Sequence, residues 1–256
     1  MSAASSEQST KFPAHGPAVA WGPMAALVVT VVALIGSQLL AGILLVSIYS
    51  GGGRQEWLGT TAGQFYFVLL SDALIVSVIW LFLRGRRAQL ADLGWSRKPA
   101  WLDIGLALLG YLVYFGAFLV LSVVASQVTQ INLEQKQELG FDFLGGGADR
   151  LMALVSLVIL PPIVEETAFR GFLFTGLRKK LSFVWTALIT SVIFASLHLL
   201  GASDGLLWVA GLDTFVLSLV LCFLREKTGA LWAPMTLHAL KNAIAFAILL
   251  SSTAVR

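Results

Sequence analysis

The chain has 256 residues, of which 57% are hydrophobic and 12% are charged. An ordinary soluble domain carries about 25% charged residues, so this composition excludes a soluble globular protein and is typical of a membrane protein. The formal net charge of +3 is distributed loop by loop rather than gathered in one basic patch, so no nucleic-acid partner is expected. The single cysteine, Cys222, excludes an internal disulfide and a multi-cysteine metal site.

Seven apolar runs are candidates for membrane spans. A helix needs about 20 mostly apolar residues to cross a bilayer, and the runs occupy, in chain order, 22–49, 64–83, 101–126, 151–177, 183–200, 206–224 and 231–251. The sequence therefore predicts an all-α fold, a polytopic membrane helix bundle of about seven transmembrane helices in contact with the lipid bilayer. An eighth helix is left open, because 130–150 and 201–210 each have room for a short helix at the membrane surface.

The polar stretches divide the chain. Residues 1–17 are polar and contain Ser, Ala and Pro, which predicts a disordered cytoplasmic tail. Residues 18–149 form the N-terminal membrane helices, and the first of these is too long for a signal-peptide core, so it is expected to be retained. The segment 130–150 has two open interpretations, an amphipathic helix on the outer surface or a solvated loop. Residues 150–251 hold most of the ionisable residues that lie inside spans.

The positive charges predict the orientation of the chain. Eleven of the 17 Lys and Arg residues fall in the N-terminal tail and in the loops after the second, fourth and sixth runs, four fall on the opposite side, and Arg170 and Lys241 lie within runs. The positive-inside rule then places the N-terminus in the cytoplasm and, with seven spans, the C-terminus outside. We expect an integral membrane protein of the plasma membrane of a prokaryote.

The fourth run ends in two adjacent carboxylates. A charge at the centre of a bilayer costs roughly 2.5–3.5 kcal/mol on insertion scales, so such residues usually face a bundle interior and serve a function. Glu166 and Arg170 are four residues apart, which puts them on one helix face in the favourable order for an ion pair. Glu165 points about 100° away, where an unpaired carboxylate in a low-dielectric cavity can take a proton from water. The alternative is that both glutamates merely pair with Arg170 or Lys241.

Two prolines stand directly before these glutamates. Pro161 and Pro162 lack amide donors, so the helix must kink or restart there. Carbonyl groups freed at membrane depth are tolerated only where they line a cavity or meet other protein groups. The prolines therefore favour a pocket at Glu165, and a simple packing kink is the alternative.

The last spans carry two more polar pairs at helical spacing. Phe194 and His198 share one face, and His238 and Asn242 share another. The second pair has two hydrogen-bonding side chains that point the same way, as an oxyanion clamp requires. Packing and interhelical hydrogen bonds are the alternatives for both pairs.

These three motifs together resemble the CPBP family of CAAX-protease and bacteriocin-processing membrane proteins, also called ABI proteins. The family pattern is EExxxR, FxxxH and HxxxN on three spans, and the chain has EETAFR at 165–170, FASLH at 194–198 and HALKN at 238–242. The resemblance covers roughly residues 150–250. It implies that 150–251 is a CPBP-like catalytic helix bundle of an intramembrane glutamic endopeptidase, which cuts near the C-terminus of a membrane-anchored or lipidated protein or peptide.

The resemblance also implies a role for each motif residue. Glu165 would be the general base on a water, assisted by His198, and His238 with Asn242 would hold the oxyanion. Glu166 and Arg170 would brace the site, with Phe194 in support. No metal or other cofactor is expected, because HExxH is absent and zinc ligands would have to come from separate spans.

Three matters stay open at this point. One alternative is a zinc-dependent form of the same protease, since two His and two Glu make a possible ligand set. Another is a non-enzymatic membrane scaffold or immunity protein that keeps the constellation as structure. Lys241 is outside the motifs, and Asp213 on the sixth span is its expected counter-charge.

Overall fold

The computed structural model describes residues 19–48, 57, 59–128, 141, 144–199 and 206–253. The described residues are helical, with no strand among them, which confirms the predicted fold class. The predicted tail at 1–17 and most of the segment at 130–150 lie outside the described residues, as do 201–205, so the expectations for them are not decided.

Ten α-helices build the described part of the chain. Their bounds are α1 Pro23–Val31, α2 Ser37–Ile48, α4 Thr61–Gly85, α5 Trp101–Val128, α6 Gly147–Leu154, α7 Leu160–Glu166, α8 Phe174–Arg178, α9 Phe183–His198, α10 Trp208–Thr228 and α11 Trp232–Thr253. Short π-helical stretches join α1 to α2 and connect α6, α7 and α8. A single interrupted helix, called the central helix below, therefore runs from Gly147 to Arg178.

Six of these helical units are long and apolar enough to cross a membrane, and they match six of the seven expected spans. The remaining expected span, 183–200, is the 16-residue helix α9. At 1.5 Å per residue α9 is about 24 Å long, which is shorter than a hydrocarbon core of about 30 Å. The chain is thus an integral membrane protein, while its orientation across the bilayer stays a prediction.

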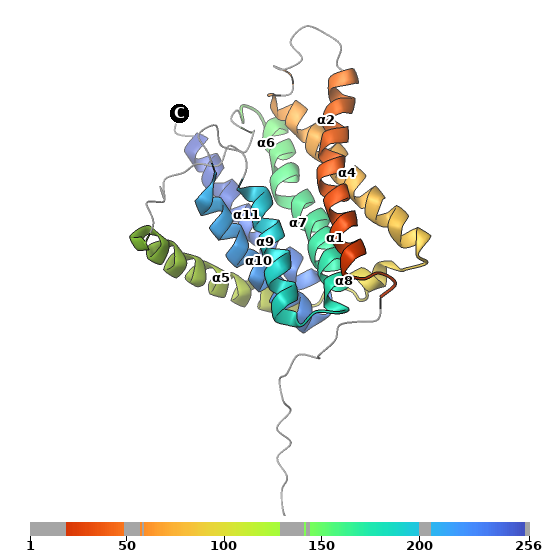
Figure 1. Ribbon diagram of the computed structural model, residues 1–256. Coiled ribbons are helices and arrows are strands. Elements are labelled where there is room, and N and C mark those ends of the chain that lie inside the picture. Colours follow the sequence, from red (N-terminus) through yellow and green to blue (C-terminus); the bar gives the residue numbers. More distant parts are fainter. Residues whose placement is uncertain are drawn as a thin grey trace, which may run out of the picture.

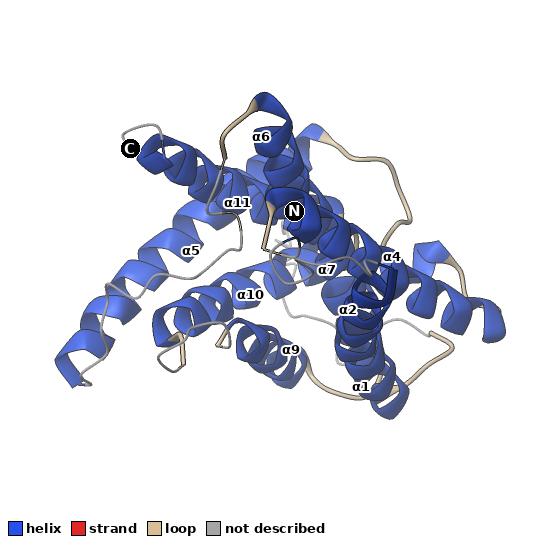
Figure 2. Ribbon diagram, turned by 90° about the horizontal axis from the view of Figure 1, so that it is seen from above, coloured by secondary structure: helices blue, strands red, loops and turns tan. Residues whose placement is uncertain are grey.

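The helices form a closed group with two outlying members. The central helix, α9, α10 and α11 stand together, whereas α4 and α5 lean away from them on opposite sides (Figures 1 and 2). The helices α9 and α10 pack side by side, and α5 packs against α10 and α11. One apolar core lies between α1, α4 and the central helix, and a second lies between α5, α10 and α11.

The first helix is fixed to the central helix by Trp21. Its indole Nε1 donates to the carbonyl of Phe172 at 3.0 Å, and the two rings stack 5.0 Å apart. A Cβ at Gly176 would come within 2.6 Å of Trp21 and Ala26, so the close approach of α1 to α8 requires glycine there.

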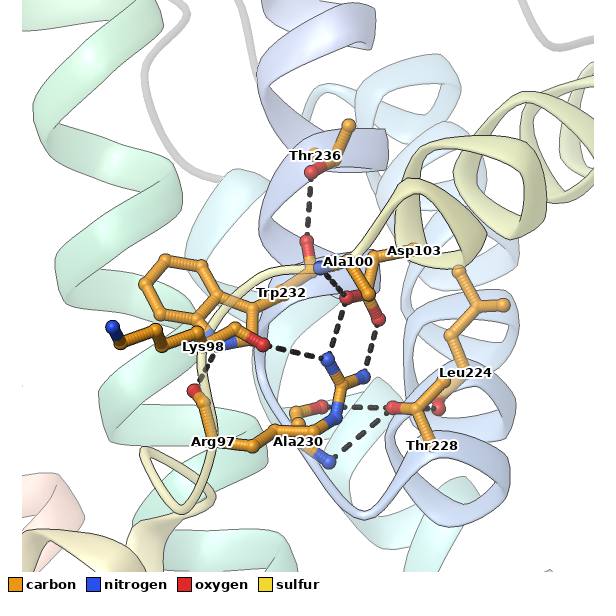
Figure 3. Close-up of polar contacts among 9 residues, drawn as sticks. All are labelled: Arg97, Lys98, Ala100, Asp103, Leu224, Thr228, Ala230, Trp232 and Thr236. Atoms are coloured by element: carbon orange, nitrogen blue, oxygen red, sulfur yellow. Dashed lines mark hydrogen bonds and ion pairs between the residues drawn. The ribbon is translucent and has the colours of Figure 1, made fainter.

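A polar cluster fixes one end of α11 (Figure 3). Arg97 donates to Asp103 at the start of α5, with Nη1 2.7 Å from Oδ2, and the carboxylate is almost fully buried. Trp232 Nε1, at the start of α11, donates to the Arg97 carbonyl at 2.7 Å. The loop between α4 and α5 therefore holds α5 and α11 together, and α11 carries two of the predicted site residues.

Candidate active site

The prolines of the central helix leave one backbone carbonyl without a hydrogen-bond donor from its own helix. Because Pro161 and Pro162 have no N–H, the Leu157 carbonyl lacks a donor at both the α-helical and the π-helical position. Asn242 Nδ2 on α11 donates to this carbonyl at 2.9 Å. The helix continues through this point, with a π-helical stretch up to Ile159 and α-helical geometry from Leu160, so the expected restart does not take the form of a gap. The carbonyl left without a helical donor is the group that Asn242 contacts on the central helix.

Glu166 and Arg170 form the predicted ion pair. Arg170 Nη1 lies 3.0 Å from Glu166 Oε1, and both side chains are fully buried. Arg170 Nη2 donates to Ser218 Oγ on α10 at 2.7 Å. Its guanidinium also lies over the Phe194 ring at 4.6 Å, a cation–π geometry. This pair links the central helix to α9 and α10, as a bracing role requires.

His238 lies between the two glutamates. Its Nδ1 is 2.9 Å from Glu166 Oε1, and its Nε2 is 3.9 Å from Glu165 Oε2. An ionised carboxylate only accepts hydrogen bonds, so Nδ1 must carry the proton in this contact. The Nε2 atom can then donate only when the ring is an imidazolium.

His198 is oriented by its own helix. Its Nδ1 lies 2.9 Å from the carbonyl of Phe194, one turn earlier on α9, and a carbonyl is again only an acceptor. The proton is therefore on Nδ1, and Nε2 is left as the second functional atom of the ring. The Phe194 ring packs 4.9 Å from the imidazole and 6.0 Å from that of His238. Phe194 thus contacts both histidines, as its supporting role predicts.

The four predicted catalytic side chains line one cavity of about 270 Å³. Glu165 comes from α7, His198 from α9, and His238 and Asn242 from α11. Glu165 remains 27% exposed, whereas Glu166 is fully buried. The structure therefore brings together residues up to 77 positions apart and separates one accessible carboxylate from one enclosed carboxylate.

Several residues at the site were not found by sequence reasoning. Ser218 holds Arg170, and Thr214 lines the cavity from α10. Serine and threonine are common in membrane helices and often bond only to their own backbone, so they gave no signal. Asp72 on α4 also lies close enough to Glu165 for the two carboxylates to interact electrostatically. Its Oδ2 is buried without a hydrogen-bond partner among the described residues.

The expected partner of Lys241 is confirmed. Its Nζ lies 3.0 Å from Asp213 Oδ2 on α10, and Tyr114 on α5 donates a hydrogen bond to the other oxygen of that carboxylate. The charge of Lys241 is therefore neutralised by α10 rather than by the glutamates of the central helix.

Zinc would require a different arrangement of these side chains. Among the described residues, no group of three or more His, Cys, Asp and Glu side chains is arranged to hold a metal ion. The Glu166 contact also places a proton on His238 Nδ1 and engages the buried carboxylate with Arg170. The described residues therefore do not fit a zinc centre as they stand.

Comparison with known proteins bears on the same part of the chain. Residues 147–244 match a family model described as Rce1-like, type II CAAX prenyl endopeptidase Rce1-like. An Escherichia coli protein described as an uncharacterized 24.3 kDa protein is 28% identical over 185 residues, which cover 69% of this chain and 78% of that protein. No solved structure matches the chain.

Two Bacillus subtilis proteins match over shorter segments. The "Putative membrane peptidase YdiL" is 36% identical over 92 residues, which cover 36% of this chain and 34% of that protein. The uncharacterized protein YpbD is 35% identical over 91 residues, which cover 36% of this chain and 42% of that protein. The family match includes all three motifs and confirms the resemblance drawn from them. Over residues 147–244, the chain is therefore similar to the Rce1-like type II CAAX prenyl endopeptidases.

Proposed function

We propose that this protein is an intramembrane endopeptidase of the glutamic type that cuts near the C-terminus of a membrane-associated or lipidated substrate. The observation that carries the proposal is the convergence of Glu165, His198, His238 and Asn242 on one cavity from three separate helices. The family match supports the class of reaction.

Glu165 is the proposed general base because it is the accessible carboxylate. Glu166 accepts from Arg170 and His238 through Oε1 and is fully buried, so its side chain is enclosed by protein, although its Oε2 has no hydrogen-bond partner among the described residues. Glu165 lines the cavity, and its side chain is 27% exposed. A water in the cavity can therefore donate to the exposed part of this carboxylate and attack from that side, with His198, which lines the same cavity, to orient it.

The reaction then proceeds by addition and elimination. Glu165 takes a proton from the water as its oxygen bonds to the scissile carbonyl carbon, which makes a tetrahedral oxyanion. The proton passes from Glu165 to the nitrogen of the scissile bond, the C–N bond breaks, and a carboxylic acid and an amine are released, which become a carboxylate and an ammonium by proton transfer. One water is consumed, and Glu165 returns to its ionised form.

His238 and Asn242 are the proposed donors to the oxyanion. His238 can donate through Nε2 as an imidazolium, and Glu166 orients the ring from behind. Asn242 donates one amide hydrogen to the Leu157 carbonyl, and its second amide hydrogen can donate to the oxyanion. Removal of one such donor typically costs about 10²–10³ in rate, so both are expected to matter without either being indispensable.

The test is cleavage by purified full-length protein in lipid nanodiscs. The reporter is a quenched fluorescent peptide that ends in a prenylated Cys followed by two aliphatic residues and one further residue, chosen from the family description. Wild-type protein should cleave it, and Glu165→Gln should abolish cleavage while its thermal unfolding is unchanged. Asp92→Asn, an equivalent change in the short 3-10 helix Leu90–Leu93 far from the cavity in sequence, is the matched control and should retain full activity, because the asparagine oxygen can still accept the bond from the Gln89 N–H. A scaffold or immunity protein would show no cleavage that depends on Glu165.

A further inference from the structure

An aromatic groove adjoins the active-site cavity. It has a volume of about 540 Å³ and lies between α5, α10 and α11. Its walls are mainly aromatic and aliphatic, with Tyr111, Phe115, Phe118, Ile244 and Ile248 among them. Lys241 and Ala245 line both the groove and the active-site cavity. The two spaces are therefore neighbours that meet at one turn of α11.

An ion pair with no net charge lies where the groove meets the cavity. Lys241 and Asp213 form the 3.0 Å ion pair described above, and Tyr114 donates to the same carboxylate. The Lys241 and Asp213 side chains are still 24% and 16% exposed. The ammonium has three donors and the carboxylate about four acceptor positions, so each can accept a further partner without breaking the pair.

The chemistry of this junction matches a peptide unit. A peptide group offers one C=O acceptor and one N–H donor. Lys241 can donate to the first and Asp213 can accept from the second. Since the pair has no net charge, it provides no reason to prefer a charged ligand. The aromatic walls beyond it are suited to apolar side chains, so the groove and junction together suit an extended peptide with apolar residues.

Two other apolar grooves on the described part of the chain do not adjoin the active-site cavity. One, of about 390 Å³, lies between α9, α10 and the far end of α5 and has no charged lining residue. The other, of about 360 Å³, lies between α4 and α7 and includes Asp72. Neither shares a lining residue with the active-site cavity. The connection to the cavity is what distinguishes the aromatic groove.

We infer that the aromatic groove is a specificity subsite for apolar residues of the substrate next to the scissile bond, and that Lys241 and Asp213 hold the substrate main chain at its entrance. This inference rests on the proposed function, since it assigns part of the substrate to a place beside Glu165. The inference predicts that substrates with apolar residues next to the scissile bond are preferred, which the catalytic residues alone do not explain.

The experiment uses two reporter peptides with the same scissile bond and prenylated end. One peptide carries three Leu residues in the segment next to the scissile bond, and the other carries Gly and Ser in that segment. Ala210→Phe should fill the aromatic groove, and Ala125→Phe should fill the groove between α9 and α10 as the matched control. We expect Ala210→Phe to raise KM for the Leu peptide about tenfold at constant kcat, to leave the Gly/Ser peptide unchanged, and Ala125→Phe to alter neither.

A second set of variants tests the junction. Lys241→Met should raise KM for both peptides about tenfold or more, because a hydrogen bond to a charged group is lost. Lys241→Arg, which preserves the charge and its pair with Asp213, should recover much of that loss. If Lys241→Met instead lowers expression, the paired change Lys241→Met with Asp213→Leu removes both charges and keeps the test valid.

Equal effects of Ala210→Phe and Ala125→Phe would overturn the inference, as would an unchanged KM in Lys241→Met. A groove that binds membrane lipid would also overturn it, since Ala210→Phe would then reduce co-purified lipid without altering the preference between peptides. Failure of the proposed function looks different, because wild-type protein would then cleave neither peptide.

Discussion

The central helix and α5 are both long, apolar membrane helices, but they occupy opposite environments. In the most apolar stretch of α5 only 17% of the residues are buried, compared with 44% in that of the central helix. Large side chains such as Leu112 and Val120 on α5 are more than 60% exposed. The central helix instead buries every residue of its segment Thr167–Leu173.

The difference lies in polar content rather than in apolar length. The central helix contains Glu165, Glu166 and Arg170, which need partners because unpaired charges are costly in hydrocarbon. Its partners come from α10 and α11 as Ser218 and His238. An apolar surface such as that of α5 gains little from leaving lipid. Buried polar networks, more than hydrophobicity, therefore determine which helices of this bundle form its interior.

The largest effect on this contrast is expected from Arg170→Ala. The change leaves Glu166 buried without its cation, and breaking a buried pair from one side typically costs about 3–5 kcal/mol. Thermal unfolding in detergent and the yield of folded protein should both fall, together with activity. A variant that is inactive but as stable as wild type would move Arg170 from bracing into the chemistry.

Asn242→Ala should act on rate more than on stability. Loss of one oxyanion donor typically reduces the rate by about 10²–10³, so slow cleavage of the reporter should remain measurable. The Leu157 carbonyl also loses its donor, which should cost about 1–3 kcal/mol of stability if no water replaces the amide. Full activity in Asn242→Ala would show that the amide serves only to pack the helices.

Pro161→Ala tests whether the missing amide donor positions Asn242. An alanine at 161 supplies the N–H that the Leu157 carbonyl lacks, so it competes with the Asn242 amide for that acceptor. We expect equal or slightly higher thermal stability and a several-fold lower rate. Combined with Asn242→Ala, the rate effects should be less than additive, because both changes act on one contact. If the rate effects of the two changes were strictly additive, Pro161 would not act through Asn242.

The smallest effect is expected on the lipid-facing side. Leu112→Ala removes a side chain that is 68% exposed on α5, and substitutions at exposed positions are usually within about ±0.5 kcal/mol. Thermal unfolding and reporter cleavage should both be close to those of wild type. A loss of several kcal/mol would mean that α5 packs against another protein surface.

The sequence was sufficient for the class of fold and for local pairings. Glu166 with Arg170 followed from the spacing of four on a helix, and the missing amide donors at Pro161 and Pro162 followed from the chemistry of proline. The short helix α9 was assigned to a span because its sequence is apolar beyond the point where the described helix ends. The pairing of Lys241 with Asp213 was also predictable, since a membrane-embedded cation needs a counter-charge and few acidic residues lie nearby in the last spans.

Contacts between distant helices could not be predicted in the same way. The bond from Asn242 to the Leu157 carbonyl depends on the register of α11 against the central helix. The contact of His238 with Glu166 rather than Glu165 has the same origin. It alters the chemistry, because it requires a charged imidazolium for the oxyanion role. The junction of Lys241 with the aromatic groove likewise appears only when α5, α10 and α11 are packed.

The central claim is that Glu165 activates water without a metal, and its most direct test is cleavage by wild-type protein after metal removal. Purified protein in nanodiscs would be treated with a strong chelator, its residual metal measured by mass spectrometry, and its reporter cleavage compared with that of untreated protein. The account predicts an unchanged rate with far less than one metal ion per chain. Complete loss of cleavage that zinc restores would contradict it, and Glu165, His198 and His238 would then be reassigned as metal ligands.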